Sequence, residues 1–341
     1  MEPTAPESPE AAVPAPVEAP PEASAAAAAP PSELYALLDS GGGRVLERLG
    51  GDLLTVRPCP PAWWRRRLPP PEWRRAMDSR QAVKPGMPLK LKIGPVRFQL
   101  NPGASVRGLA PELEDHWEQL QALCAAFTNR HRLAPRVLHL YGGAGGATLA
   151  AAQAGAAVTH VDASADAIKR ARDHAALNTL ANRDIRWVVD DPVKFAQRER
   201  AQPAAGSNRY DMVILDPHSP GPRDQNQGRG GKSQPQGQGG KGQNQAVISN
   251  ARPSNFEPER DLPALLATAS GLLSDKAAAV FLFLRQGAPA SPTTVLHLFR
   301  QEFSIFGGTP ASGEILLSSE DASVPAIPSG TFGLWMKNPK P

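Results

Sequence analysis

The sequence contains few cysteines and no long apolar run. Only Cys59 and Cys124 occur among 341 residues, too few for a disulfide framework and at no spacing typical of a metal site. No apolar run reaches the roughly 18 residues that a membrane-spanning helix needs. The acidic start of the chain also lacks the basic and apolar regions of a signal peptide. We therefore expect a cytoplasmic protein without a metal centre.

A strong excess of one charge is also absent. The chain has 37 lysines and arginines against 33 acidic residues, a net charge of +4, which permits a nucleic-acid partner without requiring one. Glycine and proline gather instead in two low-complexity segments, an Ala/Pro-rich tail at 1–32 and a Gly/Gln-rich insert at about 218–250. Both have too few apolar side chains to pack, so we expect both to be disordered. Composition does not indicate an oligomeric state.

The remaining chain divides into two regions. Residues 33–110 are expected to form a small β-rich N-terminal region, which includes a hairpin over 89–102. Residues 111–341 form the larger domain. In it, from Arg136 onward, apolar strands alternate with amphipathic helices. This βαβ series predicts an α/β fold, a Rossmann-like, doubly wound parallel sheet with right-handed crossovers. Two short strands near the C-terminus should complete the sheet.

A glycine-rich turn follows the first strand of this series. In "YGGAGGAT", the glycines at 143, 145 and 146 let the backbone turn tightly and approach a ligand in front of a helix N-terminus. Such a turn suits dinucleotides, other nucleosides or no ligand at all. It therefore has to be considered together with the residues at the ends of the following strands.

Acidic residues stand at the ends of the next three strands. Asp162 follows Gly145 by 17 residues (162 − 145), a spacing at which a carboxylate can accept both hydroxyl groups of a ribose. Asp190 and Asp191 end the third strand, where an acid can accept an adenine amino hydrogen, and Asp216 ends the fourth. Together they predict a compact adenosyl ligand. Each acid alone has an alternative role as a helix cap or turn residue.

Several stretches carry a family resemblance, namely "GGATLAAAQAGAAVTHVDAS", "RWVVDDPVKF" and "NRYDMVILDP". Through them, residues 136–280 resemble a class I S-adenosylmethionine-dependent methyltransferase. More narrowly, the chain is similar to the bacterial group related to the large-subunit ribosomal RNA cytosine methyltransferases. Upstream, "WRRRLP" and "RGLAPELEDHW" extend the resemblance. It implies S-adenosyl-L-methionine as cofactor and RNA, above all ribosomal RNA, as substrate.

The resemblance also implies a role for each matched position. The cofactor would be bound by Tyr141, Gly143, Gly145, Gly146, Asp162, Ala163, Asp190, Asp191 and Asp216. Within this set, Gly143 and Gly145 would lie under the methionine part and Asp162 would hold the ribose. Asp191, rather than Asp190, would meet the adenine amino group. Asp216 would face the methyl group. By its own chemistry, Asp216 could also position the acceptor through a hydrogen bond, and His218 is a candidate proton acceptor.

The chain departs from the family pattern at the fourth strand. The family continues Asp-Pro with a second proline and then a phenylalanine, whereas this chain has Asp216-Pro217-His218. Methylation of cytosine at its five-position needs a cysteine nucleophile, and none follows the fifth strand. An amine or hydroxyl acceptor therefore fits better. The departures keep open a catalytically inactive homologue that binds S-adenosylmethionine or RNA, and an NAD-dependent oxidoreductase fits the acids less well.

Tryptophan and arginine are interleaved upstream of the larger domain. The stretch "PPAWWRRRLPPPEWRRAM" contains Trp63, Trp64 and Trp73 among five arginines. Arginine pairs with phosphates and stacks on bases, and tryptophan stacks as well, so this composition suits an RNA-contacting face. The alternative is that the tryptophans pack inside a small domain with the arginines at its rim. His139 and His160 lie in strands and are expected in the core.

Overall fold

The computed structural model describes residues 33–51, 53–79, 88–101, 106–202, 209–217, 256–285 and 290–338. The tail at 1–32, the insert at about 218–250 and His218 lie outside these residues. None of the helices in the described ranges combines the length and the apolar character that crossing a bilayer requires.

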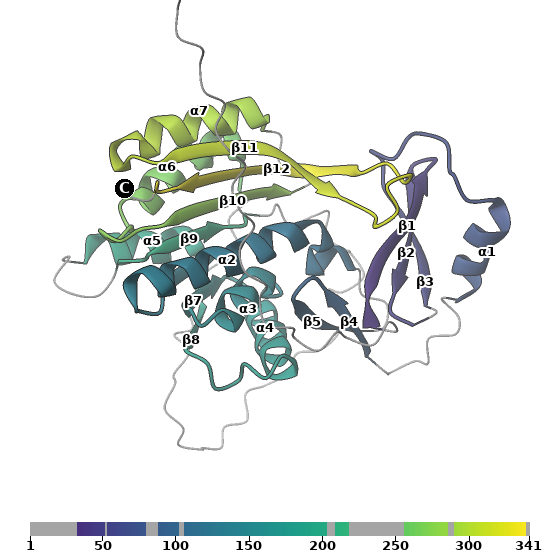
Figure 1. Ribbon diagram of the computed structural model, residues 1–341, viewed down its shortest axis with the longest axis horizontal. Coiled ribbons are helices and arrows are strands. Elements are labelled where there is room, and N and C mark those ends of the chain that lie inside the picture. Colours follow the sequence, from purple (N-terminus) through teal and green to yellow (C-terminus); the bar gives the residue numbers. More distant parts are fainter. Residues whose placement is uncertain are drawn as a thin grey trace, which may run out of the picture.

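A seven-stranded sheet forms the centre of the molecule, in the order β11-β12-β10-β9-β6-β7-β8 (Figure 1). Its strands are β6 (Arg136–Leu140), β7 (Ala157–Asp162), β8 (Ile185–Val189), β9 (Met212–Leu215), β10 (Ala279–Arg285), β11 (Thr309–Leu317) and β12 (Ile327–Met336). Strands β6 to β10 pair in parallel, and β12 runs antiparallel to both of its neighbours. The predicted Rossmann-like α/β sheet is confirmed.

The last two strands differ from the prediction of short strands. Strand β11 has nine residues and β12 has ten, the longest in the described chain. Their length was hidden by small and turn-forming residues within them, such as Gly313, Pro328 and Gly330. The two strands pair along almost their whole length, with one register shift between Ile315 and Leu316.

Helices cover both faces of the sheet. One face carries α2 (Glu114–His131), α3 (Gly146–Gln153) and α4 (Ala165–Leu177), and the other carries α5 (Pro192–Ala201), α6 (Pro258–Ser270) and α7 (Pro292–Phe303). Met212 and Ile214 of β9 join the first core, whereas Val213 and Leu215 join the second. A strand buried on both faces is apolar at every position, which explains the continuous apolar run of β9.

The helix starts follow local signals in the sequence. Ser164 caps α4, because its Oγ accepts a hydrogen bond from the backbone N–H of Ala167 at 3.2 Å. Pro192 opens α5, where its fixed φ is compatible with the first helical turn. Short 3-10 helices cover Val106–Leu109, Pro111–Leu113 (η4) and Ser304–Phe306.

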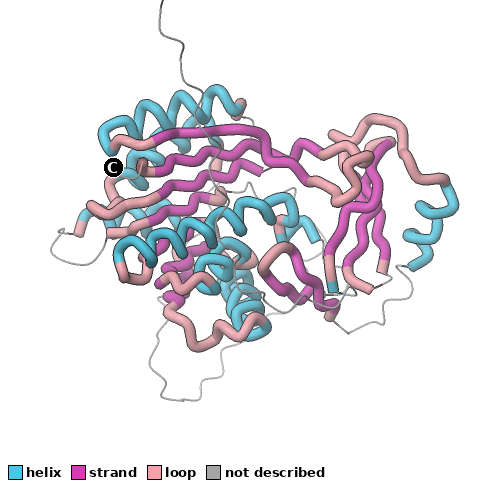
Figure 2. Tube along the Cα trace, viewed as in Figure 1, coloured by secondary structure: helices cyan, strands magenta, loops and turns pink. Residues whose placement is uncertain are grey.

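The N-terminal region is β-rich, as predicted, with one additional helix. Strands β1 (Tyr35–Gly41), β2 (Arg44–Leu49) and β3 (Leu54–Pro58) form an antiparallel sheet, and α1 (Pro70–Ser79) packs on it by burying Trp73 against Leu46 and Val56. Figure 2 shows this small sheet apart from the large one. The helix was not predicted, because its prolines and arginines obscure its single buried face.

The predicted hairpin is present as β4 (Leu89–Ile93) and β5 (Val96–Leu100), joined at Gly94 with φ +50°. Its side chains share the core of α2, α3 and α4. The ring of Phe98 lies 5.8 Å from that of Trp117 and 5.1 Å from that of His174, measured between centroids. The hairpin is thus anchored to the larger domain through its buried face.

The N-terminal sheet packs against one end of the β11–β12 pair, the end at Leu317 and Ile327. Leu317 and Ile327 share a small core with Leu37 of β1, and the Oγ of Ser319 donates to the carbonyl of Leu37 at 2.7 Å. Gly330, near the start of β12, pairs with Arg285 at the carboxyl end of β10. The N-terminal sheet is therefore held beyond the carboxyl ends of the central strands (Figure 1).

Candidate functional site

The central sheet changes winding direction at β6. From β6 the chain continues to β7 and β8 on one side, and to β9 and β10 on the other. Ligands of open α/β sheets bind at such a switch point, beyond the carboxyl ends of the strands. Here the backbone N–H of Asp216 donates to the carbonyl of Leu140 at 3.2 Å. Asp216 and the glycine-rich turn therefore follow two paired strands and begin next to each other.

The turn after β6 has an unusual backbone. Tyr141, Gly143 and Gly145 have φ values of 60°, 53° and 92°, and the left-handed region is unfavourable for tyrosine. Strained residues of this kind cluster at ligand sites. The Tyr141 hydroxyl is buried and has no hydrogen-bond partner within the described part of the chain. Burial and the neighbouring Asp191 carboxylate raise the pKa of Tyr141, so the hydroxyl remains a donor.

The glycines of the turn serve two different purposes. A Cβ on Gly146 would lie 2.2 Å from the ring of Trp117, and one on Gly142 would lie 2.3 Å from the ring of His160. These two glycines are required by packing. A Cβ on Gly143 would meet nothing closer than 3.9 Å. Gly143 therefore fits the expected ligand contact best, whereas the cofactor role of Gly146 stays a prediction.

Asp162 connects the turn to β7. It is buried, and its Oδ2 accepts a hydrogen bond from the N–H of Gly143 at 2.9 Å, while its Oδ1 accepts one from the N–H of Ser164 at 2.8 Å. Each carboxylate oxygen has a second lone pair, so both can still accept a ribose hydroxyl. Ala163, half-buried, lies between Asp162 and Ser164 in the sequence. The arrangement is compatible with the predicted ribose contact.

The two acids after β8 already have structural partners. Asp190 forms an ion pair with Arg198 and accepts the N–H of Asp191 at 2.8 Å. Asp191 caps α5, because its Oδ1 accepts the N–H groups of Val193 at 2.9 Å and Lys194 at 3.1 Å. The helix-cap alternative thus describes Asp191 in this structure. Its contact with an adenine amino group stays a prediction.

Asp216 lies in a cluster of three charges. The Nε of Arg285 donates to its Oδ1 at 3.0 Å, and Nη1 of the same arginine lies 3.8 Å from Oε1 of Glu112, on η4. All three side chains are at most 17% exposed. Burial acts to lower the pKa of Arg285, but the Asp216 and Glu112 carboxylates outweigh it and raise that pKa. The arginine is therefore permanently charged.

Sequence reasoning missed Arg285 and Glu112 as site residues. Arg285 ends the apolar run of β10, next to the strand that Asp216 ends, and a charge in that position was the available signal. The pairing with Glu112 joins positions far apart in the chain and has no local signature.

His139 and His160 lie in the core, as predicted. The Oγ1 of Thr148 lies 2.8 Å from the Nδ1 atom of each. Burial, together with the charge of Arg285, lowers the pKa of His139 to about 3, and burial lowers that of His160 far below its ordinary value. Both are neutral at pH 7 and support the turn from below. Neither is placed to exchange protons with solvent.

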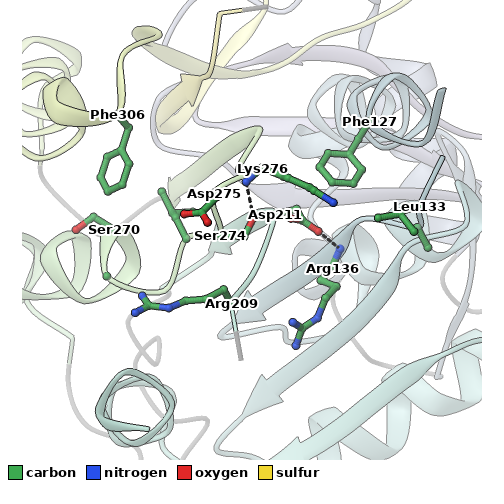
Figure 3. A pocket seen from close by; sticks show the side chains of 13 residues that line it. Phe127, Leu133, Arg136, Arg209, Asp211, Ser270, Ser274, Asp275, Lys276 and Phe306 are labelled. Atoms are coloured by element: carbon green, nitrogen blue, oxygen red, sulfur yellow. Dashed lines mark hydrogen bonds between the residues drawn. The ribbon is translucent and has the colours of Figure 1, made fainter. Parts of the chain in front are cut away.

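A separate pocket of about 780 Å³ lies at the opposite edge of the sheet, near the amino ends of β6, β9 and β10 (Figure 3). Arg136, Arg209 and Lys276 line it together with Phe127 and other residues. None of the predicted site residues contributes to it. The pocket is therefore distinct from the carboxyl edge, where the predicted site residues lie.

Comparisons with known proteins agree with the fold. No family model and no curated protein sequence matches the chain. Among solved structures, a SAM-dependent methyltransferase from Agrobacterium tumefaciens matches with a TM-score of 0.70 and 26% identity, over 89% of this chain and 90% of that one. A putative methyltransferase from Streptococcus mutans matches with a TM-score of 0.57 and 14% identity, over 90% of this chain and 76% of that one.

Strand order and these matches define the class of the protein, which has the class I methyltransferase fold. The predicted resemblance to S-adenosylmethionine-dependent methyltransferases is confirmed. The narrower grouping with the ribosomal RNA cytosine methyltransferases stays a prediction.

Proposed function

We propose that this chain transfers a methyl group from S-adenosylmethionine to an amine or hydroxyl of an RNA, with ribosomal RNA as the expected substrate. The observation that carries the proposal is the position of the turn at Tyr141, of Asp162 and of Asp216 beside the switch point, at the carboxyl ends of adjacent strands. Direct displacement of this kind depends on alignment of the reactants more than on acid–base help. When bound, S-adenosylmethionine supplies the electrophilic methyl group.

The residues present fit this cofactor. Asp162 has lone pairs for the ribose hydroxyls, and Gly143 leaves open space beside the turn. The buried Tyr141 hydroxyl is a donor that a polar ligand group would satisfy. Asp190 and Asp191 lie next along the same edge of the sheet, where the adenine would bind. This fit supports the cofactor-binding role predicted for these positions.

The acceptor chemistry follows from Asp216 and from the cysteines. Asp216 would orient the acceptor through a hydrogen bond, and His218 is a candidate proton acceptor. Cys59 and Cys124 are both buried, and burial raises the pKa of Cys124 to about 12. A thiol of that kind is inert as a nucleophile. These observations favour an amine or hydroxyl over the five-position of cytosine, and the buried thiols accord with a cytoplasmic location.

The tryptophan–arginine stretch supports RNA as the partner in part. Trp73 is buried and donates from its Nε1 to Asp39 at 3.1 Å, and Trp64 donates to Ser40 at 3.0 Å. Trp63, however, is 82% exposed. The five arginines that follow it in the sequence, Arg65, Arg66, Arg67, Arg74 and Arg75, are also exposed. An exposed tryptophan followed by exposed arginines suits contact with single-stranded RNA.

A second candidate is a homologue that binds the cofactor without turning it over. The ion pair between Asp216 and Arg285 favours it, because that carboxylate is already engaged. The two candidates differ in one product. Both bind S-adenosylmethionine, but only the enzyme converts it into S-adenosylhomocysteine.

The test uses methyl-labelled S-adenosylmethionine and RNA from the source organism with the gene deleted. The enzyme should transfer label to one RNA species and form S-adenosylhomocysteine, and RNA from the unmodified organism should accept less. Trp63→Ala should raise the KM for that RNA at least fivefold without changing thermal stability, since the side chain is exposed. Cofactor binding without transfer to any RNA would favour the inactive homologue.

A further inference from the structure

The pocket at the amino edge of the sheet brings together three cationic side chains from neighbouring strands. Arg136 begins β6, Arg209 precedes β9 and Lys276 precedes β10, and all three line the pocket (Figure 3). The three strands are adjacent in the order β10-β9-β6. Because neighbouring strands lie about 4.8 Å apart, the fold itself brings these residues close together, although they are far apart in the sequence.

Hydrogen bonds hold the backbone of this edge in place. The N–H of Asp211 donates to the carbonyl of Arg136 at 2.8 Å, and the N–H of Ala278 donates to the carbonyl of Asp211 at 2.7 Å. Arg209 and Lys276 each stand two residues before one of these donors. The three cations are therefore attached to a fixed platform, and a ligand would not have to order the backbone on binding.

The charged ends of these side chains have no ionic partner within the described part of the chain. No ion pair and no side-chain hydrogen bond of Arg136, Arg209 or Lys276 occurs there. Arg136 has one ring contact, with its guanidinium 5.6 Å from the ring centre of Tyr210. Arg136 and Arg209 are half-buried and Lys276 is exposed. Unpaired cations that converge on one pocket favour an anionic ligand.

Two carboxylates line the same pocket without forming ion pairs with these cations. Asp211 is buried and accepts hydrogen bonds from neutral groups, the N–H of Arg136 at 2.8 Å and the hydroxyl of Ser274 at 2.6 Å. Asp275 is exposed, so its carboxylate can accept a hydrogen bond from a hydroxyl or amino group of a ligand. Three cations against two carboxylates leave the lining with one positive charge (3 − 2).

Much of the remaining lining is apolar. Phe127, Leu133 and Phe306 contribute to it, and Leu133 is 52% exposed. Ile305, the neighbour of Phe306 in the chain, is 83% exposed. Exposed apolar side chains beside a pocket indicate a ligand with an apolar body. The volume of about 780 Å³ lies within the range typical of small-molecule sites.

We propose that this pocket is a second ligand site, which binds a nucleotide. Arg136, Arg209 and Lys276 hold the phosphate, and the apolar wall holds the base. Guanidinium groups pair with phosphate oxygens in a fork, and the several oxygens of a phosphate can engage several cations at once. The nucleotide is either free or part of an RNA strand. Because the pocket lies at the edge of the sheet opposite to Asp216, the inference does not depend on methyl transfer.

The test is titration calorimetry on the full chain. The titrants are the four ribonucleoside 5′-monophosphates, the four nucleosides without phosphate, and a single-stranded RNA of about ten nucleotides. The pocket variant is Arg209→Gln with Lys276→Gln. The control variant, Arg172→Gln with Lys90→Gln, removes the same charge at exposed positions that do not line the pocket. Both variants should melt at the temperature of the natural protein, since the exchanged side chains have no partners to lose.

At least one monophosphate should bind the natural protein, and its nucleoside should bind at least about tenfold more weakly. The pocket variant should lose about tenfold or more in affinity for that monophosphate, whereas the control variant should keep it. Leu133→Ser should weaken the same ligand several-fold without a change in thermal stability.

The RNA distinguishes the two sources of the nucleotide. If the site takes part of an RNA strand, the RNA should bind at least about tenfold more tightly than any monophosphate and lose this affinity in the pocket variant. If the site takes a free nucleotide, the monophosphate should bind at least as tightly as the RNA.

Three results would overturn the inference. The first is that neither the monophosphates nor the RNA bind at about 1 mM, the limit of weak specific binding. The second is binding that the pocket variant leaves unchanged, which would place the nucleotide elsewhere. The third is an equal loss in the pocket and control variants, which would show only a general attraction of anions to a basic protein. Each of these leaves the proposed methyl transfer at the carboxyl edge standing.

Discussion

Two aspartates flank strand β9, and their surroundings differ. Asp211 precedes the strand and Asp216 follows it, and both are buried. Asp211 accepts the backbone N–H of Arg136, at the start of β6, at 2.8 Å and the hydroxyl of Ser274 at 2.6 Å, and both donors are neutral (Figure 3). Asp216 is held by a charged arginine beside a second carboxylate. Asp211, before the strand, is a structural acid, and Asp216, after it, is the acid for which we propose a function.

The contrast extends to the two edges of the sheet. The amino edge contains the large pocket, but its buried carboxylate is satisfied by fixed neutral groups. The carboxyl edge contains a strained turn and a buried hydroxyl without a partner within the described residues. A strained backbone and an unsatisfied buried group indicate a ligand site better than the presence of a pocket alone does.

The carboxyl edge should be the acid-sensitive one, because His139 and His160 lie beneath its turn. Their pKa values are depressed in the folded state, so the unfolded chain binds more protons below about pH 6.5, and stability is lost as pH falls from there toward 3. Two histidines at about 1.4 kcal/mol per pH unit each give a loss of about 4–5 kcal/mol between pH 6 and 4.

Urea unfolding at several pH values measures this loss. His160→Asn keeps a polar group near Thr148 but removes one titrating site, so the histidine-linked slope of stability against pH should fall by about half. The same slope in the variant would show that His160 does not titrate in this range.

The next largest effect separates the two aspartates. Asp211→Ala leaves a buried backbone N–H and a hydroxyl without their acceptor, which should cost about 2–4 kcal/mol of unfolding free energy. Asp216→Ala should cost less, about 1–2 kcal/mol, since Arg285 keeps its pairing with Glu112.

Methyl transfer provides the matching readout. Asp211→Ala should leave turnover by the folded protein unchanged, whereas Asp216→Ala should lower it without a matching loss of S-adenosylmethionine affinity. A turnover that falls equally in both variants would remove the distinction between the two edges.

The smallest effect concerns Gly143. Both Gly143 and Gly155 have left-handed backbone, with φ of 53° and 85°, and open space at the Cβ position. Alanine at either should cost about 1 kcal/mol in stability. Only Gly143→Ala should also weaken S-adenosylmethionine binding, by about five- to tenfold, as calorimetry would show. Equal affinity in the two variants would place the cofactor away from the turn.

The fold was predicted well for strands that are buried on both faces. Strands such as Met212–Leu215 are covered on both faces and appear as continuous apolar runs, and Ser164 and Pro192 mark helix starts locally. Helix α1 and the length of β12 were missed, because tertiary pairing there outweighs local proline, glycine and arginine signals.

The sequence predicted where the candidate site residues stand, but not which groups they contact. Asp162, Asp191 and Asp216 do stand at strand ends, but their partners come from other elements: the turn N–H, the α5 backbone and Arg285. Periodicity reports only which face a residue occupies, so contacts across the chain such as Arg285–Glu112 have no sequence signature. His218, the other predicted catalytic residue, lies outside the described residues.

The central claim is that the carboxyl edge binds S-adenosylmethionine through Asp162, and calorimetry on one variant tests it directly. Asp162→Ala removes two charge-assisted hydrogen bonds to the ribose, each worth about 1.5–3 kcal/mol, so affinity should fall at least tenfold. Ser164→Ala, which removes only the cap of α4, is the control and should bind normally. Unchanged affinity in folded Asp162→Ala would contradict the account.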